Sequence, residues 1–364
     1  MRPHGKLNML FAAAIAVSMC AGLCACGNGS GSSAAEPAKK ATADQATLYS
    51  SQEHRKLIID TDTGADDASA LLLAAKQPNV DILGITVLLG NVDLEQGTKN
   101  VLETLEQANC DAPVYKGSAE TYDGTEKTAY SVFGNDGMGD ADLIHPEKQA
   151  AEGDAVDFII DTVKADPGEV EIVMLGPATN IAKAIKKDPD AMKKVKRIWS
   201  MGTCGLGAGN ASPVAEFNVY ADAPAYKIML DSGLPITVIG LDVCDGEAEW
   251  TDEGFAELEA KGKTGEFVAK SFGKIREFYR GNGIKTVMNC DSLAMMCVLF
   301  PDFIKSTINT HASCIVDVGE TYAEVLFYKE GFTYDSADYD FDYNVVLVTE
   351  VDKAAFFDNY KSVL

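Results

Sequence analysis

Residues 56–73 read KLIIDTDTGADDASALLL, and this stretch decides the fold. The apolar run Leu57–Ile59 is short and continuous, which is typical of a strand buried on both faces of a parallel sheet. Asp66 and Asp67 follow closely and favour the N-terminus of a helix, which is expected to stop at Pro78. A buried strand that leads directly into a helix predicts the start of an α/β fold.

The same alternation continues along the chain. Further strands are expected at Val80–Leu89, Val170–Leu175, Arg197–Met201 and Ile236–Leu241, and helices at Leu94–Ala108, from Thr179 onward and over most of Asp252–Arg280. The last part adds a hairpin of Ser313–Val318 and Tyr322–Tyr328, a strand at Val345–Val348 and a terminal helix. The pattern predicts an α/β fold with a mostly parallel, Rossmann-like central sheet flanked by helices, and an antiparallel edge near the C-terminus.

The N-terminal residues differ in composition from the rest of the chain. Two basic residues precede an apolar run that is too short to span a membrane, so residues 1–25 are predicted to be an export signal. The signal ends in LCAC, which resembles a bacterial lipobox and makes Cys26 the expected lipidation site. Residues 26–53 lack apolar periodicity and predict a flexible tether to a catalytic domain at 54–364. The expected location is the extracellular face of the bacterial cytoplasmic membrane, with secretion as the alternative.

Charge and cysteine content exclude some classes of function. The 364 residues include 31 Lys and Arg against 55 Asp and Glu, a balance that repels nucleic acid and anionic membrane surfaces. A membrane is therefore an expected partner only through the lipid anchor. Six cysteines lie beyond the lipobox, and their spacing fits neither a CxxC metal site nor a compact disulfide framework. We expect most of them to be buried thiols.

Four carboxylates within eight residues, Asp60, Asp62, Asp66 and Asp67, need an explanation. A helix N-terminus would account for the last two, but not for two more at the end of a strand. Buried carboxylates need a basic partner or a metal, and the nearest basic residues lie at the opposite end of the strand. A hard cation with oxygen ligands fits this pattern, and Ca²⁺ accepts six to eight of them.

Two other motifs begin in a similar way. An EF-hand loop would carry an acidic or Asn side chain where Gly64 stands and a Glu where Leu71 stands, so that motif is excluded. Haloacid-dehalogenase-like phosphatases also place Asp-x-Asp after a strand, but with Thr or Val at the position of Gly64 and without an Asp doublet. Such a phosphatase is a lower-ranked alternative.

Residues 60–67 resemble the Asp-x-Asp-Pro-Gly-x-Asp-Asp signature of the nucleoside hydrolases of the inosine-uridine preferring type, with Thr63 in place of Pro. Further segments that resemble family motifs follow in order: ITVLLGN at 85–91, LGPATNIA at 175–182, GNASPVAEFN at 209–218 and DSLA at 291–294. The resemblance implies a nucleoside hydrolase-like fold that hydrolyses the N-glycosidic bond of ribonucleosides with Ca²⁺, giving ribose and free base for salvage. It also implies a homodimer or homotetramer.

The resemblance carries over to particular side chains by position. The implied metal ligands are Asp62, Asp67, the backbone carbonyl of Leu175, and Asp291. Asp62 would also deprotonate the attacking water. The implied ribose contacts are Asp66, Asn91, Asn210, Glu216 and Asn218, assisted by the backbone at Met201. Independently, Glu216 and Asn218 are two residues apart and would share one face of an extended segment, where both could reach a sugar hydroxyl.

The pattern departs from the family at the leaving-group position. Well-known members carry His before the last metal-binding Asp, where this chain has Cys290. A thiol beside an anionic Asp stays protonated and could donate to the base, although a buried filler is an equal interpretation. Phe133 stands where some members carry a second His. The absent histidines keep open a non-catalytic nucleoside- or sugar-binding lipoprotein of the same fold.

The residues that bind the base are the most difficult to predict from the sequence. Phe217 lies inside the sugar-binding match and is the expected stacking partner of the base. Further aromatic candidates are Tyr130, Phe133, Phe278 and Tyr279. Aromatic side chains at such spacing are also common in cores, so the base preference stays open.

Overall fold

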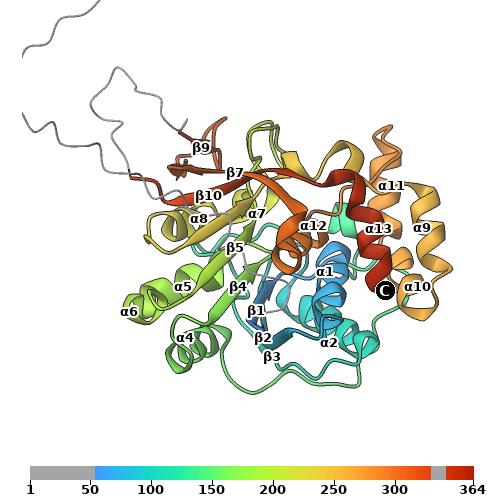
Figure 1. The fold of residues 1–364 in the computed structure, drawn as a ribbon, viewed down its shortest axis with the longest axis horizontal. Helices are drawn as coiled ribbons and strands as arrows, with labels where there is room; N and C mark the ends of the chain where they lie inside the picture. The colour runs from blue at the N-terminus through green and yellow to red at the C-terminus, as the bar shows by residue number, and fades with distance from the viewer. Residues whose placement is uncertain (1–53, 329–341) are drawn as a thin grey trace, which may run out of the picture. The chain divides into compact units, whose positions relative to one another are not determined.

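The computed structural model describes residues 54–328 and 342–364 (Figure 1). The predicted export signal, the lipidation site at Cys26 and the tether lie outside the described residues. In the described part of the chain, no helix combines the length and the apolar character that a membrane span requires.

An eight-stranded sheet forms the centre of the fold, in the order β3-β2-β1-β4-β5-β6-β10-β7. Its strands are β1 (Arg55–Thr61), β2 (Val80–Val87), β3 (Val114–Lys116), β4 (Val170–Met174), β5 (Arg197–Met201), β6 (Ile236–Ile239), β7 (Ile304–Thr310) and β10 (Val345–Val351). Neighbouring strands are parallel except β7, which pairs antiparallel with β10 at the edge. The predicted mostly parallel sheet with an antiparallel edge is confirmed.

Helices cover both faces of this sheet (Figure 1). One face packs against α1 (Ala65–Ala75), α2 (Leu94–Ala108), α9 (Asp252–Glu259), α10 (Lys263–Ser271), α11 (Gly273–Gly281), α12 (Cys290–Leu299) and α13 (Lys353–Val363). The other packs against α4 (Ala155–Ala165), α5 (Thr179–Lys187), α6 (Pro189–Met192) and α8 (Ala223–Leu230). Leu57 and Ile59 belong to the first core and Ile58 to the second, which explains why the first strand reads as an unbroken apolar run.

Two parts of the fold differ from the prediction. The hairpin expected to finish the sheet instead forms a separate two-stranded sheet of β8 (Ala312–Cys314) and β9 (Val325–Phe327). The edge strand is β7, which the sequence analysis missed because most of its residues are only partly buried and polar residues interrupt it. The long helical stretch after Asp252 is three helices, and Gly262 separates the first two with a φ of +94°, a conformation that favours glycine.

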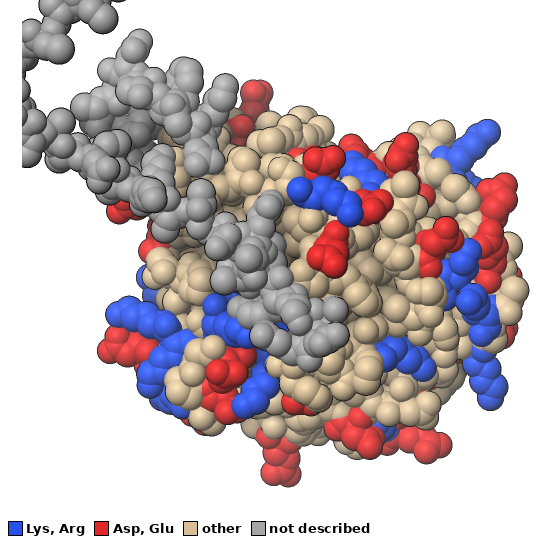
Figure 2. Space-filling view, viewed as in Figure 1, with Lys and Arg blue, Asp and Glu red and all other residues tan. Residues whose placement is uncertain are grey.

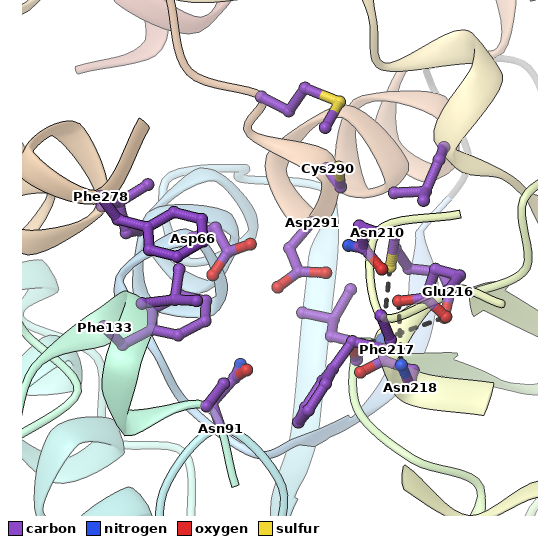
Figure 3. A pocket seen from close by; sticks show the side chains of 18 of the residues that line it. Asp66, Asn91, Phe133, Asn210, Glu216, Phe217, Asn218, Phe278, Cys290 and Asp291 are labelled. Carbon is purple, nitrogen blue, oxygen red and sulfur yellow. Dashed lines mark hydrogen bonds between the residues drawn. The ribbon is translucent and has the colours of Figure 1, made fainter. Parts of the chain in front are cut away.

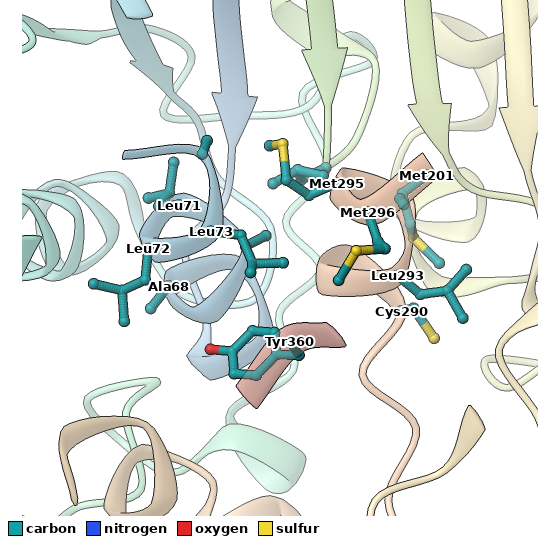
Figure 4. Close-up of a cluster of buried hydrophobic side chains, with 14 of the residues drawn as sticks. Ala68, Leu71, Leu72, Leu73, Met201, Cys290, Leu293, Met295, Met296 and Tyr360 are labelled. Carbon is teal, nitrogen blue, oxygen red and sulfur yellow. The ribbon is translucent and has the colours of Figure 1, made fainter. Parts of the chain in front are cut away.

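The packing of α1 against α12 brings two distant segments together. Leu73 of α1 points toward Met296 of α12, and Tyr360 of α13 lies against α1 (Figure 4). At the N-terminal ends, Asn289 caps α12 and its amide donates a 2.9 Å hydrogen bond to Ser69 Oγ. Ser69 and Ser292 also join through their hydroxyls. Since these bonds fix both helix N-termini, the acidic residues at each N-terminus face a common region.

The surface carries charges of both signs. On the face shown in Figure 2, Lys and Arg side chains lie among Asp and Glu side chains. The described surface carries ion pairs such as Lys116 with Glu95 at 2.6 Å and Lys187 with Asp157. Exposed pairs of this kind contribute little to stability, about 0–1 kcal/mol each.

Candidate functional site

A pocket opens at the carboxyl ends of the parallel strands near β1. At β1 the strand order reverses, because β2 and β3 lie on one side of it and β4 to β6 on the other. The structure brings together there all predicted substrate-binding residues: Asp66, Asn91, Met201, Asn210, Glu216, Phe217 and Asn218. Leu175, Cys290 and Asp291 line the same pocket. Figure 3 shows Asp66, Phe133 and Phe278 on one side, Asn210, Glu216, Phe217 and Asn218 on the other, and Asp291 between them.

Asp67 belongs to a cluster of carboxylates beside the pocket. Oxygen atoms of Asp66, Asp67 and Asp291 lie within 4.8 Å of one another. Asp67 itself is fully buried and held by three donors: the Thr61 hydroxyl at 2.6 Å, the Gly64 N–H at 2.9 Å and the side-chain amide of Asn91 at 3.0 Å. This network fixes the Asp67 carboxylate in one orientation toward its neighbours.

Asp62 is also fully buried, and its two carboxylate oxygens differ in their hydrogen bonding. Oδ2 accepts a 2.7 Å hydrogen bond from the main-chain N–H of Asn91, whereas Oδ1 has no hydrogen-bond partner in the described structure. Two glycines make room for this side chain. A Cβ at Gly90 would lie 2.0 Å from Oδ2, and one at Gly176 would lie 2.8 Å from Oδ1. The glycines in the LLGN and LGPATN segments are therefore explained by close approach to Asp62.

The electrostatics of the cluster fit a divalent cation. Burial, and then the charge of Asp67, raises the pKa of Asp62 well above its ordinary value, and the same two causes act in the same order on Asp291. Burial and Asp67 raise the pKa of Asp66 to about 8. Oδ1 of Asp66 is, like Oδ1 of Asp62, buried without a partner. Repelling carboxylates with unused oxygens suit a hard cation such as Ca²⁺ or Mg²⁺, since all the donors are oxygen.

Asp60 does not take part in this cluster. Its Oδ1 accepts hydrogen bonds from the Thr86 hydroxyl at 2.5 Å and the Asn180 amide at 2.8 Å. Burial nevertheless raises the pKa of Asp60 to about 7. Neutral donors from β2 and α5 therefore satisfy part of this carboxylate. Thr86 and Asn180 were missed as candidates, although both lie in segments that resemble family motifs.

The side of the pocket that carries Glu216 and Asn218 is built around a short helix, α7 (Phe217–Ala221). Glu216 is its N-cap: Oε1 accepts from the Asn218 N–H at 2.9 Å, and Oε2 from the N–H groups of Val219 and Thr203, both at 3.2 Å. The expectation of an extended segment was wrong, because the helix begins directly after Glu216. Both side chains still line the pocket. Burial raises the pKa of Glu216 to about 7.

Asn218 and Leu175 are in direct contact. The Asn218 amide donates a 2.6 Å hydrogen bond to the Leu175 carbonyl, the group expected to bind the metal. A carbonyl oxygen has two lone pairs, so it can accept this bond and keep one lone pair for an ion. Asn218 also lies 3.4 Å from the Met201 carbonyl. The amide thereby links the ends of β4 and β5.

The remaining wall of the pocket is apolar. Its side chains include Val132, Phe133, Ile275, Phe278 and Met288, and Phe217 lies across the pocket from Phe133 and Phe278 (Figure 3). Tyr130 is not part of it, because it does not line the pocket and its hydroxyl bonds to Asp93 at 3.0 Å. A flat, apolar leaving group would be well accommodated at this end.

The six described cysteines beyond the lipobox are free, and four of them are buried. Cys290 opens α12 and lines the pocket, and the neighbouring thiol of Cys244, together with burial, raises the pKa of Cys290 well above its ordinary value. Cys244 in turn donates to the Gly240 carbonyl at 3.5 Å. No local motif predicted that Cys244 would lie near Cys290, because the two residues belong to distant segments.

Comparison with known proteins shows which protein family and which solved structures this chain is similar to. The sequence model of the family described as inosine-uridine preferring nucleoside hydrolase matches residues 57–358. Uridine nucleosidase 1 of Arabidopsis thaliana is 37% identical over 254 residues, which cover 69% of this chain and 75% of the relative. The pyrimidine-specific ribonucleoside hydrolase RihB of Escherichia coli (strain SE11) is 32% identical over 277 residues, covering 75% and 87%. The solved structure of the plant nucleoside hydrolase PpNRh1 superposes with a TM-score of 0.80 at 29% identity, covering 85% of this chain and 98% of that one.

Proposed function

Because the chain belongs to the inosine-uridine preferring nucleoside hydrolase family and is thus a ribonucleoside hydrolase, we propose that it works with Ca²⁺ at the site around Asp62. The observation that carries this proposal is the carboxylate cluster of Asp66, Asp67 and Asp291 beside the pocket. Asn91 connects it to the buried Asp62, since it donates hydrogen bonds to both Asp62 and Asp67, and one oxygen each of Asp62 and Asp66 has no partner. A chain without an ion there would hold several carboxylates at a large electrostatic cost.

Asp62, Asp67, Asp291 and the Leu175 carbonyl would hold the ion. When bound, Ca²⁺ would orient a water molecule and the ribose hydroxyls and would lower the pKa of that water. The free Oδ1 of Asp62 is the base that accepts the proton of the attacking water. Because Asn91 fixes the other oxygen, this base needs no rearrangement before the reaction.

The ribose would lie among the polar side chains of the pocket. Asp66, Asn91, Asn210, Glu216 and Asn218 are the proposed hydrogen-bonding partners of its hydroxyls. Cleavage of an N-glycosidic bond passes through an oxocarbenium-like transition state, which carboxylates near the sugar stabilise. The base would lie among the aromatic side chains of the pocket, and Phe217 is its proposed stacking partner.

A non-catalytic nucleoside binder is the second candidate, and one observation favours it. The pocket-lining residues within the described structure include no histidine. Phe133 and Cys290 stand at the two positions where other members of the family carry His. A binder would keep the ribose contacts and lose turnover.

A panel of nucleosides separates the two candidates. The exported chain is incubated with inosine, guanosine, adenosine, uridine and cytidine in Ca²⁺, and free ribose is measured as reducing sugar. We expect ribose release that stops with a chelator, resumes with Ca²⁺ and is absent in Asp62→Ala. Saturable nucleoside binding without ribose release would refute the hydrolase and support the binder.

We also propose that the protein is anchored through Cys26 as a homodimer or homotetramer on the outer face of the cytoplasmic membrane. The LCAC segment supports the anchor. Radiolabelled palmitate should be incorporated into the unaltered protein and not into Cys26→Ala, which should appear in the medium. Light scattering of the detergent-solubilised protein tests the oligomer, and a monomer at working concentrations would refute it.

A further inference from the structure

The carboxylate cluster is assembled from the N-terminal ends of two helices. Asp66 and Asp67 come from α1, and Asp291 comes from α12. Because like charges repel, the carboxylates by themselves would hold the two helix ends at no defined distance. That distance matters for the choice of ion, since Ca²⁺ takes oxygen ligands at about 2.3–2.6 Å and Mg²⁺ at about 2.0–2.1 Å.

Three buried, uncharged side chains join the two helix ends: Ser69 of α1, and Asn289 and Ser292 at the start of α12. The Asn289 amide donates a 2.9 Å hydrogen bond to Ser69 Oγ, and the hydroxyls of Ser69 and Ser292 bond to each other. Ser69 Oγ also donates to the Asp66 carbonyl at 3.2 Å, and Asn289 Oδ1 accepts from the Ser292 N–H at 3.3 Å. This set, the serine–asparagine bridge, therefore lies within one helical turn of the carboxylates on each helix.

The other contacts of α12 do not fix the spacing at this end. Further along the two helices the contact is apolar, where Leu73 points toward Met296 (Figure 4). Apolar contacts are not directional, so they define the distance between two helix ends less sharply than hydrogen bonds do. At the C-terminal end of α12, the guanidinium of the buried Arg55 donates to the Val298 carbonyl. The helix is thus held by β1 at its far end and by the serine–asparagine bridge at the end that carries the carboxylate.

We propose that the serine–asparagine bridge holds the two halves of the carboxylate cluster at the spacing of the larger ion, and thereby favours Ca²⁺ over Mg²⁺. This inference rests on the proposed Ca²⁺-dependent function and deepens it. Oxygen atoms of Asp66, Asp67 and Asp291 lie within 4.8 Å of one another, so that one Ca²⁺ can contact all three. A rigid bridge resists the contraction that Mg²⁺ requires, and it removes the cost of ordering two helix ends when Ca²⁺ binds.

Calorimetric titration of the metal-free chain with Ca²⁺ and with Mg²⁺ tests this role without any substrate. Asn289→Ser keeps an oxygen at the N-cap of α12, because Ser caps helices as well as Asn does, but its side chain is too short to reach Ser69. We expect the Kd for Ca²⁺ to rise by about three- to tenfold, the effect of one lost buried hydrogen bond. The Kd for Mg²⁺ should change by less than about twofold, because a looser gap can close around the smaller ion.

Two further variants separate this role from a general loss of stability. Ser69→Ala removes the bridge from the other helix and leaves the N-cap of α12 intact. If both changes act through one bridge, the double variant should lose no more Ca²⁺ affinity than either single variant. Ser200→Ala is the matched control, since Ser200 is equally buried and its hydroxyl lies 3.0 Å from the Tyr226 hydroxyl in the other core. It should lower the melting temperature and leave the ratio of the two Kd values unchanged.

The results that would overturn the proposal differ from those that concern the hydrolase. An unchanged ratio of the Mg²⁺ and Ca²⁺ dissociation constants in both Asn289→Ser and Ser69→Ala would overturn it, whatever happens to the melting temperature. Additive losses in the double variant would do the same, because the two residues would then act separately. An unaltered chain that binds Ca²⁺ more tightly than Mg²⁺ but releases no ribose would refute the hydrolase and leave the bridge supported. Ribose release without a preference for Ca²⁺ would refute the bridge alone.

Discussion

The main-chain N–H of Asn91 donates a 2.7 Å hydrogen bond to Oδ2 of Asp62 and leaves Oδ1 of the same carboxylate buried without a partner. Asn91 follows β2, and Asp62 follows the neighbouring strand β1. The pairing of these strands therefore sets the orientation of Asp62. An acceptor that is held in place and has one unused oxygen is suited to take a proton from water.

Asp62→Asn should abolish most activity without unfolding the protein. The amide oxygen can still accept from Asn91, but the side chain can no longer accept a proton from water. We expect kcat/KM to fall by about 10²- to 10⁴-fold, the usual range for a lost general base. In chelator, the variant should melt at a higher temperature than the unaltered protein, because it lacks a carboxyl group whose ionised form is disfavoured by burial and by the charge of Asp67. Asp142→Asn, at a side chain that is 93% exposed, is the control, and equal activity of both variants would contradict the role.

Thr63 should support metal binding through Thr61. The Thr61 hydroxyl donates to Asp67 at 2.6 Å, so the Thr63 hydroxyl, 3.0 Å away, is the donor to Thr61. Thr63→Val keeps the shape and removes this bond, worth about 0.5–1.5 kcal/mol. The dissociation constant for Ca²⁺, measured by calorimetry, should rise by about two- to tenfold, and Thr63→Ser should restore it. An unchanged constant in Thr63→Val would show that the hydroxyl pair does not act on Asp67.

The metal-free protein should lose stability as the pH rises. Burial raises the pKa of Asp66 from 3.8 to about 8 and that of Glu216 from 4.5 to about 7. The folded state then binds more protons than the unfolded state between these values, so the free energy of unfolding falls from about pH 4 to about pH 8. The melting temperature in chelator should be lower at pH 8 than at pH 5. Added Ca²⁺ should raise it more at pH 8, because the ligands must be deprotonated. A melting temperature in chelator that rises with pH would contradict the burial of these groups.

Phe217 should contribute to the binding of the base. It lines the pocket beside Glu216 and Asn218, and the base end is otherwise apolar. Phe217→Ala should raise KM for nucleosides by about tenfold, equivalent to about 1.4 kcal/mol for a lost stacking contact. The inhibition constant of ribose should change little, because ribose carries no base that could stack on Phe217. Leu206→Ala, at a side chain that is 64% exposed, is the control. A parallel weakening of ribose binding would mean that Phe217 shapes the sugar site instead.

Sequence reasoning worked best where local pattern decides structure. The run Leu57–Ile59 and the Asp doublet predicted β1 and the start of α1, because burial on both faces and a helix N-terminus leave direct traces in sequence. It placed Glu216 and Asn218 in the pocket correctly but expected an extended segment there, because a five-residue helix has too few residues for a periodic signal. It also missed β7, whose partner β10 lies far along the chain.

Near neighbours in the chain are enough to show that several carboxylates gather at the end of the first strand and that a layered α/β fold carries them. Which groups share the site depends on contacts between segments that are far apart in the sequence. Asp291 meets Asp67 because α12 packs against α1, and the same packing places Cys290 in the lining of the pocket. Distances between remote residues depend on helix packing and strand order, which no single segment encodes.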